Sequence, residues 1–155
     1  MARVRWRGCC AFLQPGIEAT VGLKDTHGLD PSQVASITLE FPNGGAPIID
    51  GNPVRSHCGQ YVLAVALVNG NVTFNDLASD LRTTEPAVAA LADRVTVVHS
   101  AELNTEFPER STSRVRLHLR DGRSFERVVV FPMGHRTIRS RKNNSGRSSG
   151  PSRRR

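Results

Sequence analysis

The chain has 155 residues, 38% of them hydrophobic and 23% charged, and a formal net charge of +7. That length fits one ordinary domain, or a domain with a tail. Such a domain can bury a hydrophobic core without stabilising disulfides or metal ions. No apolar run approaches the roughly 20 residues of a membrane-spanning helix, and the first residues lack the apolar stretch of a secretory signal. Composition thus excludes a membrane span, a small disulfide-stabilised protein and a wholly disordered chain, and it leaves the function open.

The positive charge is concentrated at the C-terminal end. Residues 136–155 contain eight of the 21 Lys and Arg residues and none of the 14 acidic residues, which leaves residues 1–135 with 13 bases and 14 acids. Almost no apolar residue follows Ile138. Such a segment cannot bury enough surface to offset its ordering entropy. We therefore predict a folded domain over 1–135 and a disordered basic tail over 136–155.

The three cysteines, Cys9, Cys10 and Cys58, form no C-x-x-C pair, and the five histidines are scattered. This spacing does not support a metal site. An odd number of cysteines without a secretory signal is typical of free thiols in a reducing compartment, so we expect a cytoplasmic protein.

The first third of the chain predicts a helix, a strand and a loop. Pro15 suits a first helical position and Gly28 suits a helix end, which favours a helix over 15–27. Residues 34–41 alternate as in a half-buried strand, and residues 42–54 are predicted to be loop. One face of that strand would carry Ala35, Ile37, Leu39 and Phe41.

The segment 61–68 is apolar on all sides, so it is buried in either of two conformations. It forms the first strand of a hairpin that turns at Asn69-Gly70, or it forms a buried helix that ends there. Local propensity slightly favours the hairpin.

The remaining residues predict two short helices and three strands. Thr73 and Asp76 have capping-box spacing before a helix at about 74–81, and a second helix opens at Glu85-Pro86. A strand follows at 95–98. The clearest hairpin turns at Asp121-Gly122, between strands 115–119 and 125–131, with Leu119 placed opposite Phe125. Helices followed by a terminal meander of strands indicate an α+β fold, in which we expect an antiparallel sheet with the helices packed on one face.

The sequence has no nucleotide-binding glycine fingerprint, no phosphate loop, no H-E-x-x-H and no G-x-S-x-G. The pair of residues best suited to catalysis is His57 and Tyr61, which would share one face of a helix or of a strand. Together they could orient or protonate an oxyanion. The alternative is a histidine at a helix start and a tyrosine whose ring packs while its hydroxyl reaches the surface.

Two groups of arginines have similar alternatives. Arg5 and Arg7 could receive a substrate carboxylate through paired hydrogen bonds, or they form a solvated basic terminus. Arg114, Arg116 and Arg120 lie on the outer face of a strand, as edge protection or as a solvated face.

Four stretches resemble the C-terminal domain of the MmgE/PrpD family, which includes 2-methylcitrate dehydratases, cis-aconitate decarboxylases and iminodisuccinate epimerases. Residues 9–19 (CCAFLQPGIEA) are similar to K-P-Y-P-C-C-R-x-x-H-P-A-I-D-A, and residues 56–70 to R-H-S-F-Q-Y-V-x-A-x-A-L-L-D-G. Residues 84–91 (TEPAVAAL) are similar to D-P-x-V-x-x-L, and residues 107–123 to the Y-P…V-x-V-x-x-x-D-G hairpin. The resemblance implies a helix at Tyr61, and we adopt it over the hairpin.

The resemblance also implies a chemistry and a site. The family's reactions are cofactor-independent dehydration, decarboxylation or epimerisation of small di- or tricarboxylates, in a cleft between this domain and a larger helical domain, and dimers are typical. Matching its motifs assigns Tyr61 as hydrogen-bond donor or acid and His57 as the residue that orients the site. The substrate-binding positions would be Arg5, Cys9, Cys10 and Gln14.

Several positions depart from the family pattern. Arg5 replaces a lysine and keeps its charge without being a titratable acid, and Gln14 replaces a histidine and loses proton transfer. The chain also contains no sequence for the helical domain. We therefore expect a C-terminal lyase domain that is inactive until a helical domain completes it in trans. The alternative is a non-catalytic assembly module whose tail binds polyanions weakly.

Overall fold

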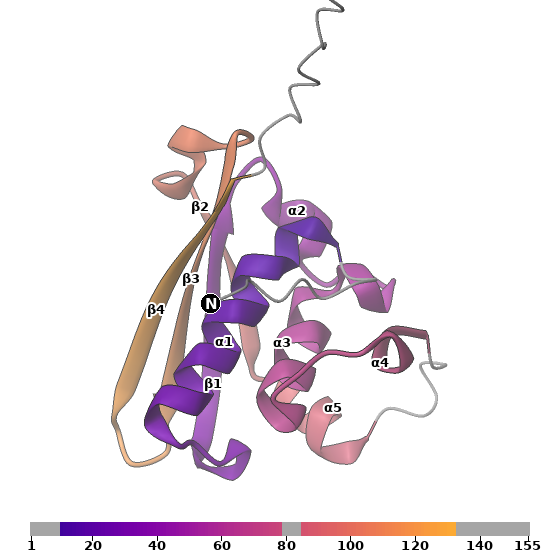
Figure 1. Cartoon of the computed structure of the whole chain (residues 1–155), viewed down its shortest axis with the longest axis vertical. Coiled ribbons are helices and arrows are strands. Elements are labelled where there is room, and N and C mark those ends of the chain that lie inside the picture. The colour runs from indigo at the N-terminus through magenta and orange to yellow at the C-terminus, as the bar shows by residue number, and fades with distance from the viewer. Residues whose placement is uncertain (1–9, 79–84, 133–155) are drawn as a thin grey trace, which may run out of the picture.

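The computed structural model describes residues 10–78 and 85–132, which form one layer of helices against a sheet (Figure 1). The helices of the described part are α1 (Gln14–His27), α2 (Ala46–Ile49), α3 (Gly59–Asn69), α4 (Phe74–Ala78) and α5 (Pro86–Ala92). The strands are β1 (Val34–Pro42), β2 (Val95–Ser100), β3 (Arg110–Leu119) and β4 (Ser124–Pro132). Short 3-10 turns are η1 (Ala11–Leu13), η2 (Pro31–Gln33), η3 (Arg55–His57) and η5 (Leu103–Glu106).

The sheet has the strand order β2-β1-β3-β4. β1 pairs antiparallel with β3, and β3 with β4, whereas β1 and β2 run parallel. The α+β fold with helices on one face of the sheet is confirmed, but the expected meander of three C-terminal strands is wrong. The segment from α2 to α5 forms a crossover connection between β1 and β2, and such a connection returns the chain parallel to its first strand.

The core lies between the sheet and helices α1 and α3. Ile37, Leu39 and Phe41 of β1 are fully buried, as are Val115 and Leu117 of β3. Each such side chain contributes roughly 1.5–3 kcal/mol when it is removed from water. The apolar layer thus holds α1 and α3 at defined positions over the strands.

The helix α3 resolves the ambiguous segment in favour of the helical prediction. Its residues 62–67 are all buried, because α1, α5 and β2 contact it from different sides. A helix pairs its own main-chain groups, so it can be buried on every side without unsatisfied donors. Gly70 ends α3 with a left-handed φ of 68°, and Gly28 ends α1 in the same way with a φ of 59°.

Three local predictions need correction. A β-bulge between Val34 and Ser36 shifts the alternation of β1, so that Val34 is buried in place of Ala35. The expected loop at 42–54 contains the short helix α2. In the β3–β4 hairpin, Phe125 lies opposite Leu117 and not opposite Leu119.

The capping interaction that was predicted for the helix α4 is present. The Thr73 main-chain N–H donates to the Asp76 carboxylate at 2.7 Å, and the Asp76 N–H donates to the Thr73 hydroxyl at 3.3 Å. The predicted end of this helix, at residue 81, lies outside the described residues, as do Arg5, Cys9 and the tail over 136–155. None of the helices in the described part of the chain has both the length and the apolar character needed to cross a bilayer.

Candidate functional site

The N-terminal ends of α1 and α3 lie at the same end of the sheet as the C-terminal ends of β1 and β2. The Cys10 N–H, just before α1, donates to the carbonyl of Ser56, just before α3, at 2.8 Å. Gly59 opens α3 in a tight space, where a Cβ atom would lie 3.1 Å from the Ile49 carbonyl oxygen and 3.3 Å from Val97. Backbone and apolar contacts therefore draw segments that are distant in sequence together at this end.

The central cluster at this end consists of Arg55, Tyr61 and the backbone of Asp76. The Tyr61 hydroxyl donates to the Asp76 carbonyl at 2.6 Å, and the Arg55 Nη1 donates to the Tyr61 hydroxyl at 3.3 Å. The Arg55 guanidinium also lies over the Tyr61 ring, 4.7 Å from its centroid. Only 5% of Arg55 is exposed. The cluster joins η3, α3 and α4 and fixes the orientation of the phenol.

The environment of Tyr61 keeps its phenol protonated at neutral pH. Burial raises the pKa of Tyr61 above its ordinary value, and this effect exceeds the opposing effect of the nearby Arg55 charge. The Asp76 carboxylate raises the pKa of Tyr61 further. Tyr61 is therefore a hydrogen-bond donor here, and in this structure its proton is directed at the Asp76 carbonyl.

His57 lies close to Tyr61 in the sequence but not on the same helical face. It belongs to η3, whereas α3 begins at Gly59 after Cys58, whose extended backbone turns the chain. The His57 Nδ1 lies 2.9 Å from the Ser56 hydroxyl. The predicted shared helical face of His57 and Tyr61 is thus wrong, because the helix starts two residues after the histidine.

The predicted substrate-binding residues are placed only in part. Cys10 is half-buried, and its backbone contact with Ser56 brings it next to the η3 segment that carries His57. Gln14 is buried in the first turn of α1. Arg5 and Cys9 lie outside the described residues. The structure therefore places Cys10 beside the segment that carries His57, while Tyr61 pairs with a residue that the sequence analysis did not single out.

Arg55 is that missed residue. Nothing in the local sequence separates it from the many exposed arginines, because its burial comes from the packing of η3 against α3 and α4. Its cationic group and the positive N-terminal end of α3 both favour a carboxylate nearby. A buried arginine beside the phenol is one feature that distinguishes this end of the domain from a helix terminus that is merely packed.

A second network at this end was also missed. The Asp50 carboxylate lies 2.9 Å from the His99 Nε2 and accepts a hydrogen bond from the Gln60 side-chain amide at 2.7 Å. The Gln60 oxygen in turn accepts from the Gly51 N–H at 2.9 Å. His99 and Asp50 are 49 residues apart in the sequence, so no spacing rule could pair them. Within residues 10–78 and 85–132, no group of three His, Cys, Asp or Glu side chains could hold a metal ion.

The arginine-rich strand has a different role. Arg114 donates to Glu40 at 2.6 Å, and Arg116 pairs with Glu126, with 3.0 Å between its Nε and the carboxylate. Both arginines lie on the sheet face away from the helices. Because β3 lies between β1 and β4, edge protection is excluded, and the prediction of an outward face holds for Arg114 and Arg116. Arg120 lies just past the end of β3, where its Nε donates to the Ser32 carbonyl at 2.9 Å.

Fold and site together define a small α+β domain with its polar groups gathered at one end, around a buried arginine and a phenol. The profile of the MmgE/PrpD C-terminal domain matches residues 8–143, so the chain belongs to the MmgE/PrpD family through that domain.

Three relatives illustrate the relationship. The 2-methylcitrate dehydratase of Cupriavidus necator is 29% identical over 141 residues, which cover 82% of this chain and 29% of that protein. The mitochondrial 2-methylcitrate dehydratase of Yarrowia lipolytica is 27% identical and the enzyme of Escherichia coli K12 is 26% identical. The matches cover 72% and 79% of this chain, but only 24% and 28% of those proteins. The chain thus spans less than a third of the length of these relatives.

Proposed function

We propose that this chain is the C-terminal part of a cofactor-independent lyase that acts on a small tricarboxylate of the 2-methylcitrate type. We further propose that it is inactive until a helical domain completes the cleft. The observation that carries the proposal is the match of residues 8–143 to the C-terminal domain of a family whose similar members are 2-methylcitrate dehydratases more than three times as long.

The proposed chemistry is the loss of water from a hydroxy acid. A base removes the proton next to a carboxylate, the C–O bond breaks, and an acid gives a proton to the leaving hydroxyl group. Tyr61 is suited to the hydrogen-bond donor or acid role, because burial keeps its phenol protonated. His57 would orient this side of the site, and Arg5, Cys9, Cys10 and Gln14 would line the substrate-binding side.

The base is assigned to the helical half of the cleft. An arginine at position 5 remains charged at neutral pH and cannot accept a proton, and the glutamine at position 14 cannot transfer one. Arg55 supports Tyr61 through its hydrogen bond and its stacking on the ring. This wall of the cleft would therefore bind and orient the substrate, while proton removal needs a group from the second wall.

The test is an activity assay on the purified chain with 2-methylcitrate and with cis-aconitate, alone and with a separately produced helical half from a relative. We expect no turnover by the chain alone and turnover when the two halves are combined. Tyr61→Phe in the combined assay should lower kcat by roughly 100-fold or more, as is usual for the loss of an acid catalyst. Turnover by the chain alone would refute the requirement for a second half.

The charge distribution favours one further function. A segment with eight bases and no acids between residues 136 and 155 would bind polyanions with a strong dependence on salt. In that case the chain serves as an assembly module, and removal of residues 136–155 should abolish binding to heparin at low salt. Retained binding would assign the polyanion contact to the folded domain.

A further inference from the structure

A small cavity opens at the end of the domain that lies opposite the Arg55–Tyr61 cluster. It has a volume of about 320 Å³ and lies between η2, the last turn of α3 and the helix α5. Val68 of α3 lines it, and this residue is separated from Tyr61 by about 10 Å along the helix. The cavity is therefore distinct from the candidate site at the other end of α3.

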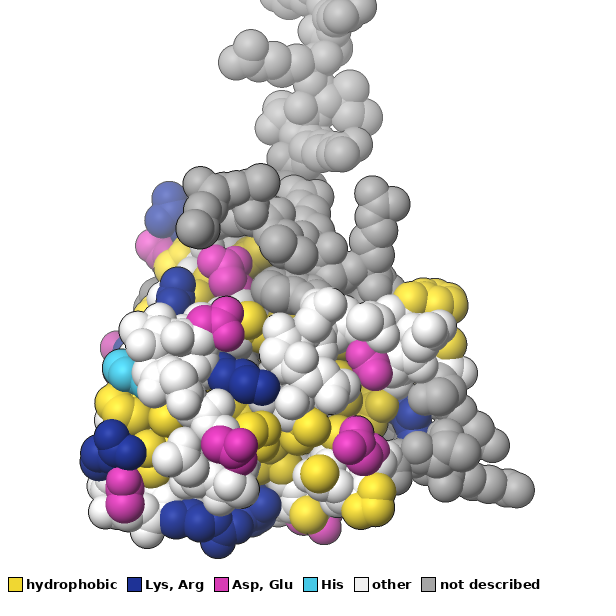
Figure 2. Space-filling model, turned by 60° about the horizontal axis from the view of Figure 1, so that its bottom comes forward, with side chains coloured by type: hydrophobic (Ala, Val, Ile, Leu, Met, Phe, Trp, Pro, Cys, Tyr) yellow, Lys and Arg dark blue, Asp and Glu magenta, His cyan; other side chains and the backbone are white. Residues whose placement is uncertain are grey.

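Most of the cavity wall is apolar. Figure 2 shows hydrophobic side chains between basic and acidic ones on this underside of the molecule. The apolar residues that line the cavity are Pro31, Val68, Ala87, Ala90 and Leu91. Cavities that bind small molecules typically have such a wall with a few placed polar groups, and volumes of about 300–1,000 Å³. This cavity is of a size for a small ligand with an apolar part.

One polar group of the cavity is the carboxylate of Asp30, in the turn that opens η2. Its Oδ1 accepts hydrogen bonds from the Ser32 N–H at 2.8 Å and from the Ser32 hydroxyl at 2.6 Å. These hydrogen bonds lower the pKa of Asp30, so the carboxylate is charged at neutral pH. Its Oδ2 accepts no hydrogen bond from any residue that the structure describes. One oxygen is thus held by the protein and the other is open to a ligand.

The second polar group is the guanidinium of Arg94, just after α5. Its Nε donates to the Ala90 carbonyl at 3.2 Å, which directs the side chain back along the helix. Within residues 10–78 and 85–132, its two terminal nitrogens have no acceptor, and no ion pair joins Arg94 to Asp30. The cavity therefore has a charge of each sign on its wall, and neither charge neutralises the other directly.

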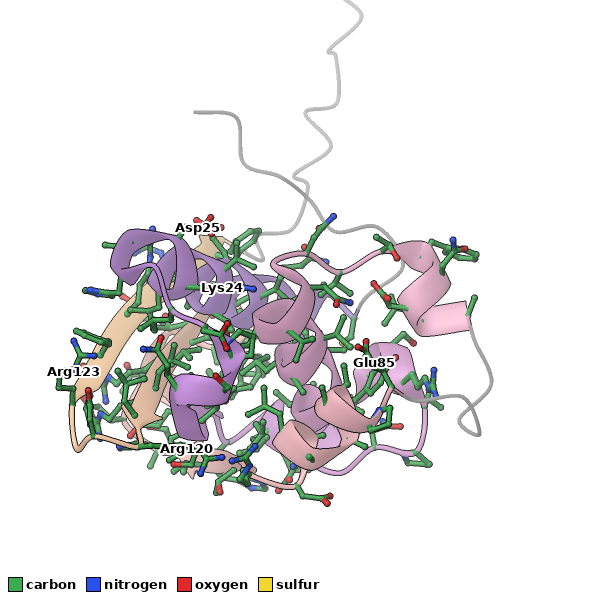
Figure 3. All side chains as sticks on the ribbon, turned by 90° about the horizontal axis from the view of Figure 1, so that it is seen from below. Lys24, Asp25, Glu85, Arg120 and Arg123 are labelled. Atoms are coloured by element: carbon green, nitrogen blue, oxygen red, sulfur yellow. The ribbon has the colours of Figure 1, made fainter. Side chains whose placement is uncertain are left out.

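The walls of the cavity are fixed by contacts from outside it. Arg120 holds η2, because its Nε donates to the Ser32 carbonyl at 2.9 Å and its N–H donates to the Gln33 carbonyl at 2.9 Å. Lys24 reaches from α1 to the end of α3, where its Nζ donates to the Leu67 carbonyl at 2.7 Å (Figure 3). A wall that is already ordered loses little entropy when a ligand binds.

We propose that this cavity binds a free α-amino acid with an aliphatic side chain. The carboxylate of the ligand would pair with the terminal nitrogens of Arg94, and its ammonium group with the Oδ2 of Asp30. The aliphatic side chain would lie against Val68 and Leu91. The proposal does not depend on the proposed function.

The charges on the wall select this class of ligand over simpler ones. A ligand with only a carboxylate would be repelled by Asp30, and one with only an ammonium group would be repelled by Arg94. An uncharged apolar ligand would remove water from both charges without pairing with either. A charged side chain on the ligand would meet the apolar wall at the same cost. An aliphatic amino acid avoids each of these penalties.

The first test compares three ligands on the unmodified full chain by isothermal titration calorimetry. Leucine has both charges, 4-methylpentanoate lacks the ammonium group, and leucinamide lacks the carboxylate. We expect leucine to bind at least about tenfold more tightly than either analogue, because each charge-assisted hydrogen bond contributes to the affinity. In NMR spectra of the labelled chain, leucine should shift the signals of Val68 and Ala90 to saturation. No saturable binding of leucine, or equal affinity for all three ligands, would overturn the proposal.

Two variants then assign each charge. Asp30→Asn keeps an acceptor for Ser32 and should weaken leucine binding about tenfold, without weakening 4-methylpentanoate. Arg94→Gln should weaken leucine to the same extent, without weakening leucinamide. Arg123→Gln is the matched control, because it removes one positive charge from the exposed β3–β4 turn, and it should leave leucine binding unchanged. Leucine affinity that stays at the wild-type value in Asp30→Asn and Arg94→Gln would overturn the assignment.

Discussion

Arginine side chains in two regions of this molecule meet opposite environments. Arg55 lies almost completely buried between η3 and α3, with its guanidinium over the ring of Tyr61. Arg114 and Arg116 lie on the face of the sheet away from the helices, where Glu40 and Glu126 pair with them. Mixed charges of both signs also lie on the underside of the molecule, seen in Figure 2 and, with Lys24, Asp25, Glu85, Arg120 and Arg123 labelled, in Figure 3.

The difference shows what burial does to the same chemical group. Exposed ion pairs contribute about 0–1 kcal/mol, because water screens them and the long side chains lose freedom. A buried guanidinium is costly to desolvate, so it must be held by hydrogen bonds and stacking, and its removal disturbs those contacts. Arg55 is therefore a candidate for function, whereas the arginines of β3 are a solvated surface.

The largest expected effect follows from removing the buried arginine. Arg55→Ala should lower the free energy of unfolding by about 2–4 kcal/mol, since it leaves a void beside the Tyr61 ring and removes its hydrogen bond. Urea denaturation measures this change. Arg123→Ala is the matched control, because its side chain is 58% exposed, although it pairs with Asp121 and lies over the Phe125 ring. An equally small change in both variants would erase the distinction between the two regions.

The next largest expected effect comes from removing the hydroxyl group of Tyr61. Tyr61→Phe should cost about 1–2 kcal/mol, because the half-buried Asp76 carbonyl loses its donor while the ring remains packed. Thermal unfolding measures it. Ser124→Ala removes a hydroxyl that reaches only the exposed His118, at 3.1 Å, and it should change stability very little. A cost for Tyr61→Phe no larger than for Ser124→Ala would mean that the Asp76 contact does not hold in solution.

A smaller effect is expected on the open face of the sheet. Arg114→Ala should cost no more than about 1 kcal/mol, and the cost should shrink as salt rises, because the pair with Glu40 is partly solvated. Unfolding measured at low and at high salt tests this. The cost of Arg55→Ala should change little over the same range. If both costs fell equally with salt, burial would not be the cause of the difference.

The smallest expected effect on stability comes from the ionisation of Tyr61. It is seen only at alkaline pH. Burial raises the pKa of Tyr61, so the folded chain binds this proton more tightly than the unfolded chain does. The stabilisation is fully present below the unfolded pKa of about 10 and is lost as pH rises through the higher folded value. Tyr61 is the only tyrosine, so tyrosinate absorbance reports it directly. A midpoint in the folded chain at or below that of the urea-unfolded chain would contradict this.

Local signals predicted much of the fold. Pro15 and Gly28 bracket α1 within one residue, and the alternation around Asp121-Gly122 predicted the β3–β4 hairpin. For α3, local propensity pointed to a hairpin, and the family resemblance correctly favoured a helix. The bulge in β1 was not predicted: Val34 and Ala35 are both apolar, and the alternation from Ala35 to Phe41 is regular, so the pattern did not show that Val34 would be the buried one.

The site was predictable to a lesser degree. Tyr61 was singled out, and its phenol lies in a defined polar contact, while the helical face that it was expected to share with His57 does not exist. Arg55 and the Asp50–His99 pair were missed, because each depends on segments that meet only after folding. The roles assigned to the site residues remain predictions that the combined assay tests.

By itself the sequence determined where α1 begins and ends, which strands form the C-terminal hairpin, and to which family the residues are similar. Those properties depend on neighbours a few positions apart, through caps, turns and side-chain periodicity. Only the tertiary structure decided that β1 lies between β2 and β3, that Arg55 is buried over Tyr61, and that Asp50 meets His99. These depend on burial, and burial is set by the packing of segments far apart in the chain.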